Sequence, residues 1–77
     1  MATEMQVRQA LINARKGKRM TQEQLAEAVG ITRAYLANIE RGKHAPSLRV
    51  AFEIARVLDR KLEDLFLEDK VRKTHGM

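Results

Sequence analysis

Residues 21–42 read TQEQLAEAVGITRAYLANIERG and hold two short helical patterns with almost no chain between them. Thr21 is expected to begin the first helix, because its hydroxyl and the glutamine three positions later match the reciprocal capping box. Gly30 is expected to end that helix in a left-handed conformation. Since Thr32 is the next N-cap, only Gly30 and Ile31 separate the helices. So short a connection forces a sharp angle between them.

The second helix of this pair is expected to run to about Arg41 and has two unlike sides. At about 100° per residue, Leu36 and Ile39 fall together on one side, which suits a core. Tyr35 and Glu40 flank them. The opposite side carries small or polar side chains, namely Arg33, Ala34, Ala37, Asn38 and Arg41. That side is too polar and too small-chained to form a core, so we expect it to face a partner.

Helical periodicity continues on both sides of this stretch, and no β-branched alternation predicts a strand. A helix is expected over about residues 5–16, with Val7, Leu11 and Ala14 facing the core. Gly17 is expected to end it in a left-handed conformation. The inner face expected for the next helix consists of Leu25, Ala28 and Val29.

Two more helices are expected toward the C-terminus, and Ser47 can cap the first of them. The apolar face of that helix consists of Leu48, Val50, Ala51, Phe52, Ile54, Ala55, Val57 and Leu58. A short fifth helix at about residues 62–67 completes an all-α, compact five-helix domain that spans residues 1–67. Residues 68–77 form a charged tail, which is expected to fray or to join a dimer contact.

The composition suits one compact domain in the cytoplasm. Of the 77 residues, 44% are hydrophobic and 32% charged, in keeping with a single small globular unit. No apolar run approaches the roughly 18 residues of a membrane span, and residues 1–16 lack the apolar centre of a signal peptide. We therefore expect a cytoplasmic protein with no membrane partner.

Residue types for metal or covalent chemistry are scarce. The absence of cysteine excludes disulfides, thiolate metal sites and cysteine nucleophiles. His44 and His75 lie far apart and have no companion at ligand spacing, so no metal site and no cofactor are expected. Because there is also no nucleophile–base pairing, phosphate-binding glycine loop or paired-carboxylate pattern, we do not expect an enzyme.

Positive charge is concentrated in the first part of the chain. The net charge is +5. Residues 1–49 hold nine basic and four acidic side chains, a net of +5, whereas residues 50–77 hold six of each, a net of zero. This balance predicts a polyanionic partner such as nucleic acid, bound by the first half of the chain.

Two helices joined by a short turn with glycine are the helix-turn-helix signature, in which the second helix enters the DNA major groove. The stretch MTQEQLAEAVGITRAYLANIERGKHAPSL, at residues 20–48, resembles the Cro/C1-type, or xenobiotic-response-element, family of regulators. The resemblance covers roughly residues 5–67. Its marks are Thr21-Gln22, Leu25-Ala26, Val29-Gly30, Ile39-Glu40-Arg41-Gly42, Pro46-Ser47 and Leu65-Phe66. It implies a lambda-repressor-like domain of five helices. It also implies a sequence-specific transcriptional regulator, and we expect a repressor.

The resemblance also implies roles for single residues. Arg33, Ala34 and Asn38 match positions that read base edges, and Gln22 matches one that meets a phosphate. The chemistry agrees, because arginine can bond guanine O6 and N7 together and asparagine can bond adenine N6 and N7. Ala37 lies on the same side, although both alanines are equally well explained as helix formers. Further candidates for contacts to the DNA backbone are Arg19, Tyr35, Arg41 and Lys43.

Two departures from the family pattern concern turns. Relatives usually carry glycine two residues before the threonine that starts the second helix, where this chain has Arg19. Before the fifth helix they favour glycine and then a hydroxyl cap, where this chain has Asp59, Arg60 and Lys61. The first departure affects only the local turn. The helix at about residues 62–67 is expected either to start differently or to rely on packing, because a lysine at a helix N-terminus is unfavourable.

In this family the residue that corresponds to Glu40 pairs with an arginine of the first helix, here Arg15, so a structural ion pair is expected. Relatives dimerise, which would place two reading helices about 34 Å apart on an inverted-repeat operator. The apolar residues expected to form the homodimer surface are Leu65, Phe66, Leu67 and Val71. The alternative is a protein-interaction module, such as an antitoxin or a controller subunit, whose DNA binding is secondary or autoregulatory.

Overall fold

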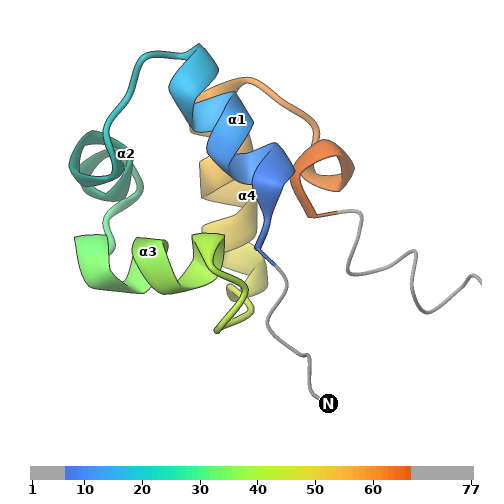
Figure 1. Ribbon diagram of the computed structural model, residues 1–77. Coiled ribbons are helices and arrows are strands. Elements are labelled where there is room, and N and C mark those ends of the chain that lie inside the picture. Colours follow the sequence, from blue (N-terminus) through green and yellow to red (C-terminus); the bar gives the residue numbers. More distant parts are fainter. Residues whose placement is uncertain (1–6, 67–77) are drawn as a thin grey trace, which may run out of the picture.

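The computed structural model describes residues 7–66 of the chain. Its helices are α1 (Gln9–Gly17), α2 (Gln22–Val29), α3 (Arg33–Glu40) and α4 (Leu48–Leu58), and residues 62–66 form a further helical turn. In Figure 1, α2 and α3 lie on one side of α4 and the segment 62–66 lies on the other. Residues 7–66 contain no strand. The predicted all-α, five-helix fold is therefore confirmed.

The N-caps of α2, α3 and α4 form as predicted. The Thr21 hydroxyl accepts from the Gln24 backbone N–H at 3.0 Å, and the Gln24 side chain accepts from the Thr21 backbone N–H at 2.9 Å. Thr32 and Ser47 accept in the same way from the backbone three residues later, at 3.0 and 3.1 Å. Gly30 has φ 85°, the left-handed conformation expected for it. These local bonds fix the tight turn between α2 and α3.

One apolar core joins all the helical segments. Its fully buried large side chains are Leu11, Leu25, Leu36, Ile39, Ile54 and Leu58. The predicted inner face of α2 is partly wrong, because Ala28 is exposed and Ala26 is buried in its place. The side of α2 that meets the core is therefore centred on Leu25, Ala26 and Val29.

The expected burial of Val7 is wrong. Val7 precedes α1, which begins only at Gln9, so the helical spacing from Leu11 does not extend to it. Its side chain is 51% exposed, and the neighbouring Arg8 is buried instead. The sequence pattern offered no hint of a buried cation at this place.

The apolar face of α4 is narrower than predicted. Val50, Ala51, Ile54, Ala55 and Leu58 are buried. By contrast, Leu48 is 66% exposed and Phe52 is 54% exposed, so their expected place in the core is wrong. They stand four residues apart, on one stripe that faces outward.

The turn from α1 to α2 also differs from prediction. Gly17 is the last residue of α1, and the left-handed residue is Arg19, with φ 60°. Arg19 stands where relatives usually carry glycine. The backbone therefore adopts a left-handed conformation, which glycine favours, at a residue that carries a side chain. A similar left-handed residue, Asp59 at φ 57°, ends α4.

Replacing Arg19 by glycine is expected to raise the free energy of unfolding by about 0.5–1 kcal/mol. A left-handed L-residue costs roughly 1–2 kcal/mol, and the greater freedom of glycine in the unfolded chain offsets part of the gain. Lys18→Gly is the matched control, because Lys18 has φ −92° and glycine there should destabilise. Urea unfolding of the two variants checks this, and equal destabilisation by both would contradict it.

Candidate nucleic-acid interface

The structure turns the polar side of α3 outward. Arg33 and Ala34 are exposed, whereas Ala37 and Asn38 are half-buried. The opposite side of α3 enters the core through Leu36, Ile39 and Glu40. The four residues expected to read bases are thus brought onto the outward side of one helix, which begins directly after the turn at Gly30.

Three of the residues expected to contact the DNA backbone lie in α3 or shortly after it, and Arg19 lies in the turn before α2. Arg19, Arg41 and Lys43 are exposed, and their charges are free to meet an anion. Tyr35 is half-buried, and its ring centroid lies 6.4 Å from that of His44. Arg41 and Lys43 follow the C-terminal end of α3, while Arg19 precedes α2.

The structure brings Arg15 and Glu40 together. Arg15 Nε donates to Glu40 Oε2 at 2.7 Å, and Arg15 Nη2 donates to Glu40 Oε1 at 3.2 Å. Glu40 is only 2% exposed. Arg15 Nη1 also donates to the Met20 carbonyl at 2.9 Å, which ties the pair to the start of α2. The carboxylate therefore faces inward, and its charge is balanced before any DNA is bound.

Gln22 has a partner that sequence reasoning missed. Its Nε2 donates to Glu40 Oε1 at 2.9 Å, and the side chain is half-buried. Gln22 is the first residue of α2 and Glu40 the last of α3. One carboxylate thus joins α1, α2 and α3.

Arg8 is a second residue that sequence reasoning missed. Arg8 Nη1 donates to the carbonyls of Ile39 and His44, at 2.7 and 3.0 Å. The Arg8 backbone N–H donates to the Glu40 carbonyl at 2.8 Å. Its guanidinium carbon lies 5.7 Å from the Phe66 ring centroid, a cation–π contact. This buried cation therefore binds the C-terminal end of α3, where the helix dipole is negative.

Two of the residues expected to form the dimer surface are buried inside the domain. Leu65 and Phe66 are buried within the chain's own core, so they offer little surface to a second copy. Leu67 and Val71 lie outside the described residues. Exposed apolar surface is found instead at Leu48 and Phe52.

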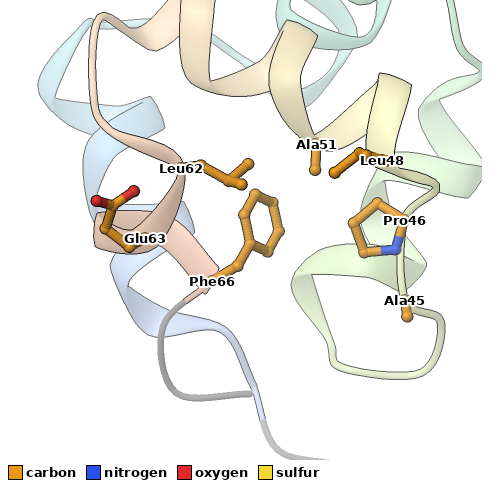
Figure 2. Close-up of a pocket in the computed structure, with 7 residues that line it drawn as sticks. All are labelled: Ala45, Pro46, Leu48, Ala51, Leu62, Glu63 and Phe66. Atoms are coloured by element: carbon orange, nitrogen blue, oxygen red, sulfur yellow. The ribbon is translucent and has the colours of Figure 1, made fainter. Parts of the chain in front are cut away.

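An apolar groove of about 650 Å³ opens beside Leu48. Figure 2 shows Leu62 and Phe66 on one side of the groove, and Leu48 and Pro46 on the other. Ala51 lies between Leu62 and Leu48 at the upper edge of the view, and Glu63 points away from the centre of the groove. The groove lies between the start of α4 and the segment 62–66.

None of the helices in residues 7–66 is long and apolar enough to cross a membrane.

Two helices joined by a tight turn, the second with a basic and small-chained outer side, define a helix-turn-helix domain that binds DNA. Comparison with known proteins agrees. The family model described as helix-turn-helix, HTH_3, matches residues 11–65. The chain therefore belongs to the helix-turn-helix family of DNA-binding transcriptional regulators.

Several relatives are transcriptional regulators or repressors. An uncharacterized HTH-type transcriptional regulator of Archaeoglobus fulgidus is 52% identical over 50 residues, which are 65% of this chain and 71% of the relative. The immunity repressor protein of Bacillus phage phi105 is 36% identical over 69 residues, or 90% of this chain and 48% of that protein. The predicted resemblance to Cro/C1-type regulators is confirmed.

Solved structures show the same fold. The restriction-modification controller protein C.AhdI from Aeromonas hydrophila superimposes with a TM-score of 0.70 and is 36% identical. The match covers 75% of this chain and 88% of that one. The arrangement of α2 and α3 is therefore that of a known group of regulators.

Proposed function

We propose that this regulator is a homodimeric repressor that binds an inverted-repeat operator in the cytoplasm and reads each half-site with α3. The observation that carries the proposal is the outward side of α3. Arg33 stands exposed in its first turn, and the small side chains Ala34 and Ala37 follow along the same side. Small residues let the helix backbone come close to the floor of the major groove, where base edges are read.

The roles of single residues follow from their chemistry. Arg33 would bond a guanine edge and Asn38 an adenine edge, which gives sequence preference. The exposed cations Arg19, Arg41 and Lys43 would meet phosphates, which gives affinity and register. Tyr35 can add a hydroxyl contact to the same backbone.

A homodimer fits the exposed apolar surface on α4. Leu48 and Phe52 present large side chains to solvent, and Leu48 lines the same groove as Phe66. A two-fold axis through this surface would bury the same residues from both copies. We propose this surface as the dimer contact, and we propose that the charged tail at residues 68–77 takes part in it.

The second candidate function is a controller or interaction module in which a protein partner matters more than the operator. The likeness to a restriction-modification controller and the apolar groove support it. In that case, the exposed surface at Leu48 would bind another protein, and DNA binding would serve autoregulation.

Selection of bound duplexes from a random DNA library at about 150 mM salt tests the two functions. Recovery of an inverted repeat, with half-sites about one helical turn apart, is the expected result. Recovery of single half-sites would contradict the dimer alone. Unselective, salt-sensitive binding would contradict the repressor and favour the interaction module.

Arg33→Ala is expected to weaken operator binding by about 1–3 kcal/mol and to relax the preference at one base pair. The matched variant Lys43→Ala is expected to weaken operator and random DNA similarly and to reduce the salt slope by about one. Fluorescence anisotropy at several salt concentrations measures both effects. Equal losses by the two variants on operator and random DNA would refute the assignment of Arg33 to base reading.

A further inference from the structure

We propose that Glu40 is a positioning residue for DNA binding, although its side chain lies inside the protein. Its carboxylate holds the Gln22 amide in the orientation that presents an N–H group to a DNA phosphate. This inference rests on the proposed function and deepens it. It assigns a DNA-binding role to a residue that sequence reasoning treated as half of a structural ion pair.

The chemistry of the carboxylate sets the direction of the Gln22 amide. An ionised carboxylate only accepts hydrogen bonds, so the nitrogen of the amide, and not its oxygen, must face Glu40. The observed bond from Gln22 Nε2 to Glu40 Oε1, at 2.9 Å, has this polarity. Without that acceptor the amide can rotate, and its oxygen can turn toward a phosphate and be repelled.

The second hydrogen on Gln22 Nε2 is left for an acceptor outside the protein. Gln22 is half-buried and begins α2, where the free backbone N–H groups and the positive end of the helix dipole also attract an anion. A phosphate bound there would accept from a side chain whose rotamer is already fixed. Binding then costs less side-chain entropy than it would with a free glutamine.

Arg15 makes a buried carboxylate compatible with this role. A lone negative charge behind Gln22 would repel the phosphate. Arg15 bonds both oxygens of Glu40, at 2.7 and 3.2 Å, so the pair carries no net charge. The ion pair thus supplies a hydrogen-bond acceptor for Gln22 without repelling a phosphate. The Met20 carbonyl holds Arg15 in place by accepting from its Nη1.

The same bond couples the two helices of the motif. Glu40 ends α3 and Gln22 begins α2. The bond between them therefore fixes the position of the phosphate-binding amide relative to α3. A change in the position of α3 would move the amide of Gln22 with it. A phosphate contact and base contacts can then form together only in one register.

A double-mutant cycle separates positioning from simple stabilisation. One change is Gln22→Met, and the other is the pair Arg15→Met with Glu40→Met, which removes the carboxylate without leaving a buried charge unpaired. Affinity is measured for a mixed-sequence duplex of ~20 base pairs at low salt, where phosphate contacts dominate. Circular dichroism and thermal melting establish that each variant is folded at the temperature of the assay.

Each change alone is expected to weaken binding by about three- to tenfold, the size of one hydrogen bond. The triple variant is expected to bind no worse than Gln22→Met, because both changes remove the same contact. Losses that multiply, or no loss from the Arg15→Met and Glu40→Met pair, would overturn the positioning role. If the unmodified protein fails to bind the duplex, the proposed function fails, and this inference fails with it.

The side-chain amide resonances of Gln22 give a second test in the unmodified protein. Gln22→Met identifies them, since it removes one pair of signals. In the free protein, one of the two protons should be shifted by its bond to the carboxylate. On addition of the same duplex, the other proton should shift while the first stays in place. Loss of the first shift on binding, or no change in the second proton, would overturn the proposal.

Discussion

Glu40→Ala is expected to lower the free energy of unfolding by about 3–5 kcal/mol, the cost typical of breaking a buried ion pair from one side. The loss arises because Arg15 stays behind with a charge that has lost both its carboxylate bonds. Gln22 loses its acceptor at the same time. For a domain of this size, whose total stability is on the order of 5–15 kcal/mol, such a loss is a large fraction.

The matched control for Glu40→Ala is the pair Arg15→Met with Glu40→Met. Replacing a buried ion pair by apolar residues of similar volume is often neutral or stabilising. We therefore expect the double variant to melt well above Glu40→Ala in urea and thermal unfolding. A melting temperature for Glu40→Ala equal to that of the unmodified protein would refute the assignment of a stabilising role to the pair.

Local signals explain why so much of the fold was predictable. Thr21, Thr32 and Ser47 cap helices through atoms within three residues, and Gly30 takes a conformation that its own lack of a side chain permits. Such features depend on short-range chemistry, and sequence carries them directly. The order of the helices and the starts of α2, α3 and α4 followed from these caps and from periodicity.

Features that depend on tertiary packing were not predictable. Periodicity indicates which residues are apolar but not which part of a wide apolar face is covered, so the exposure of Leu48 and Phe52 was missed. Because α1 begins later than expected, Arg8 is buried and Val7, which was expected to be buried, is exposed. The left-handed turn fell on Arg19, because α1 continues through Gly17.

The candidate site was predictable only where a residue faces outward. Arg33 and Ala34 lie on an exposed side that helical geometry alone defines. The bond from Gln22 to Glu40 joins residues 18 positions apart, and no spacing rule connects them. The pairing of Arg15 with Glu40 was expected from family resemblance, since charge alone does not select one arginine among several.

The end of α3 is held by several inward contacts, which together fix the position of this helix. Glu40 is bound through its side chain by Arg15 and Gln22, and through its carbonyl by the backbone of Arg8. These contacts come from α1, from the residue before it, and from α2. The eight-residue helix α3 therefore gains a fixed orientation from the rest of the domain.

Arg8→Ala is expected to lower the free energy of unfolding by about 2–4 kcal/mol. The carbonyls of Ile39 and His44 would lose a charged donor near the C-terminal end of α3, and a hydrogen bond from a charged group is worth roughly 1.5–3 kcal/mol. The contact of the guanidinium with the Phe66 ring would be lost as well. Urea unfolding measures the change in stability.

Arg56→Ala provides the matched control for Arg8→Ala, because it removes the same side chain from an exposed ion pair. Arg56 Nη2 lies 2.7 Å from Glu53 Oε1, but the Arg56 side chain is largely in solvent, so less than about 1 kcal/mol should be lost. Amide hydrogen exchange adds a local test, since Arg8→Ala should also raise the exchange rate at the C-terminal end of α3 above the level set by global unfolding. Equal losses of stability in the two arginine variants would show that burial gives Arg8 no special weight, and α3 would then owe its orientation to Arg15 and the apolar core alone.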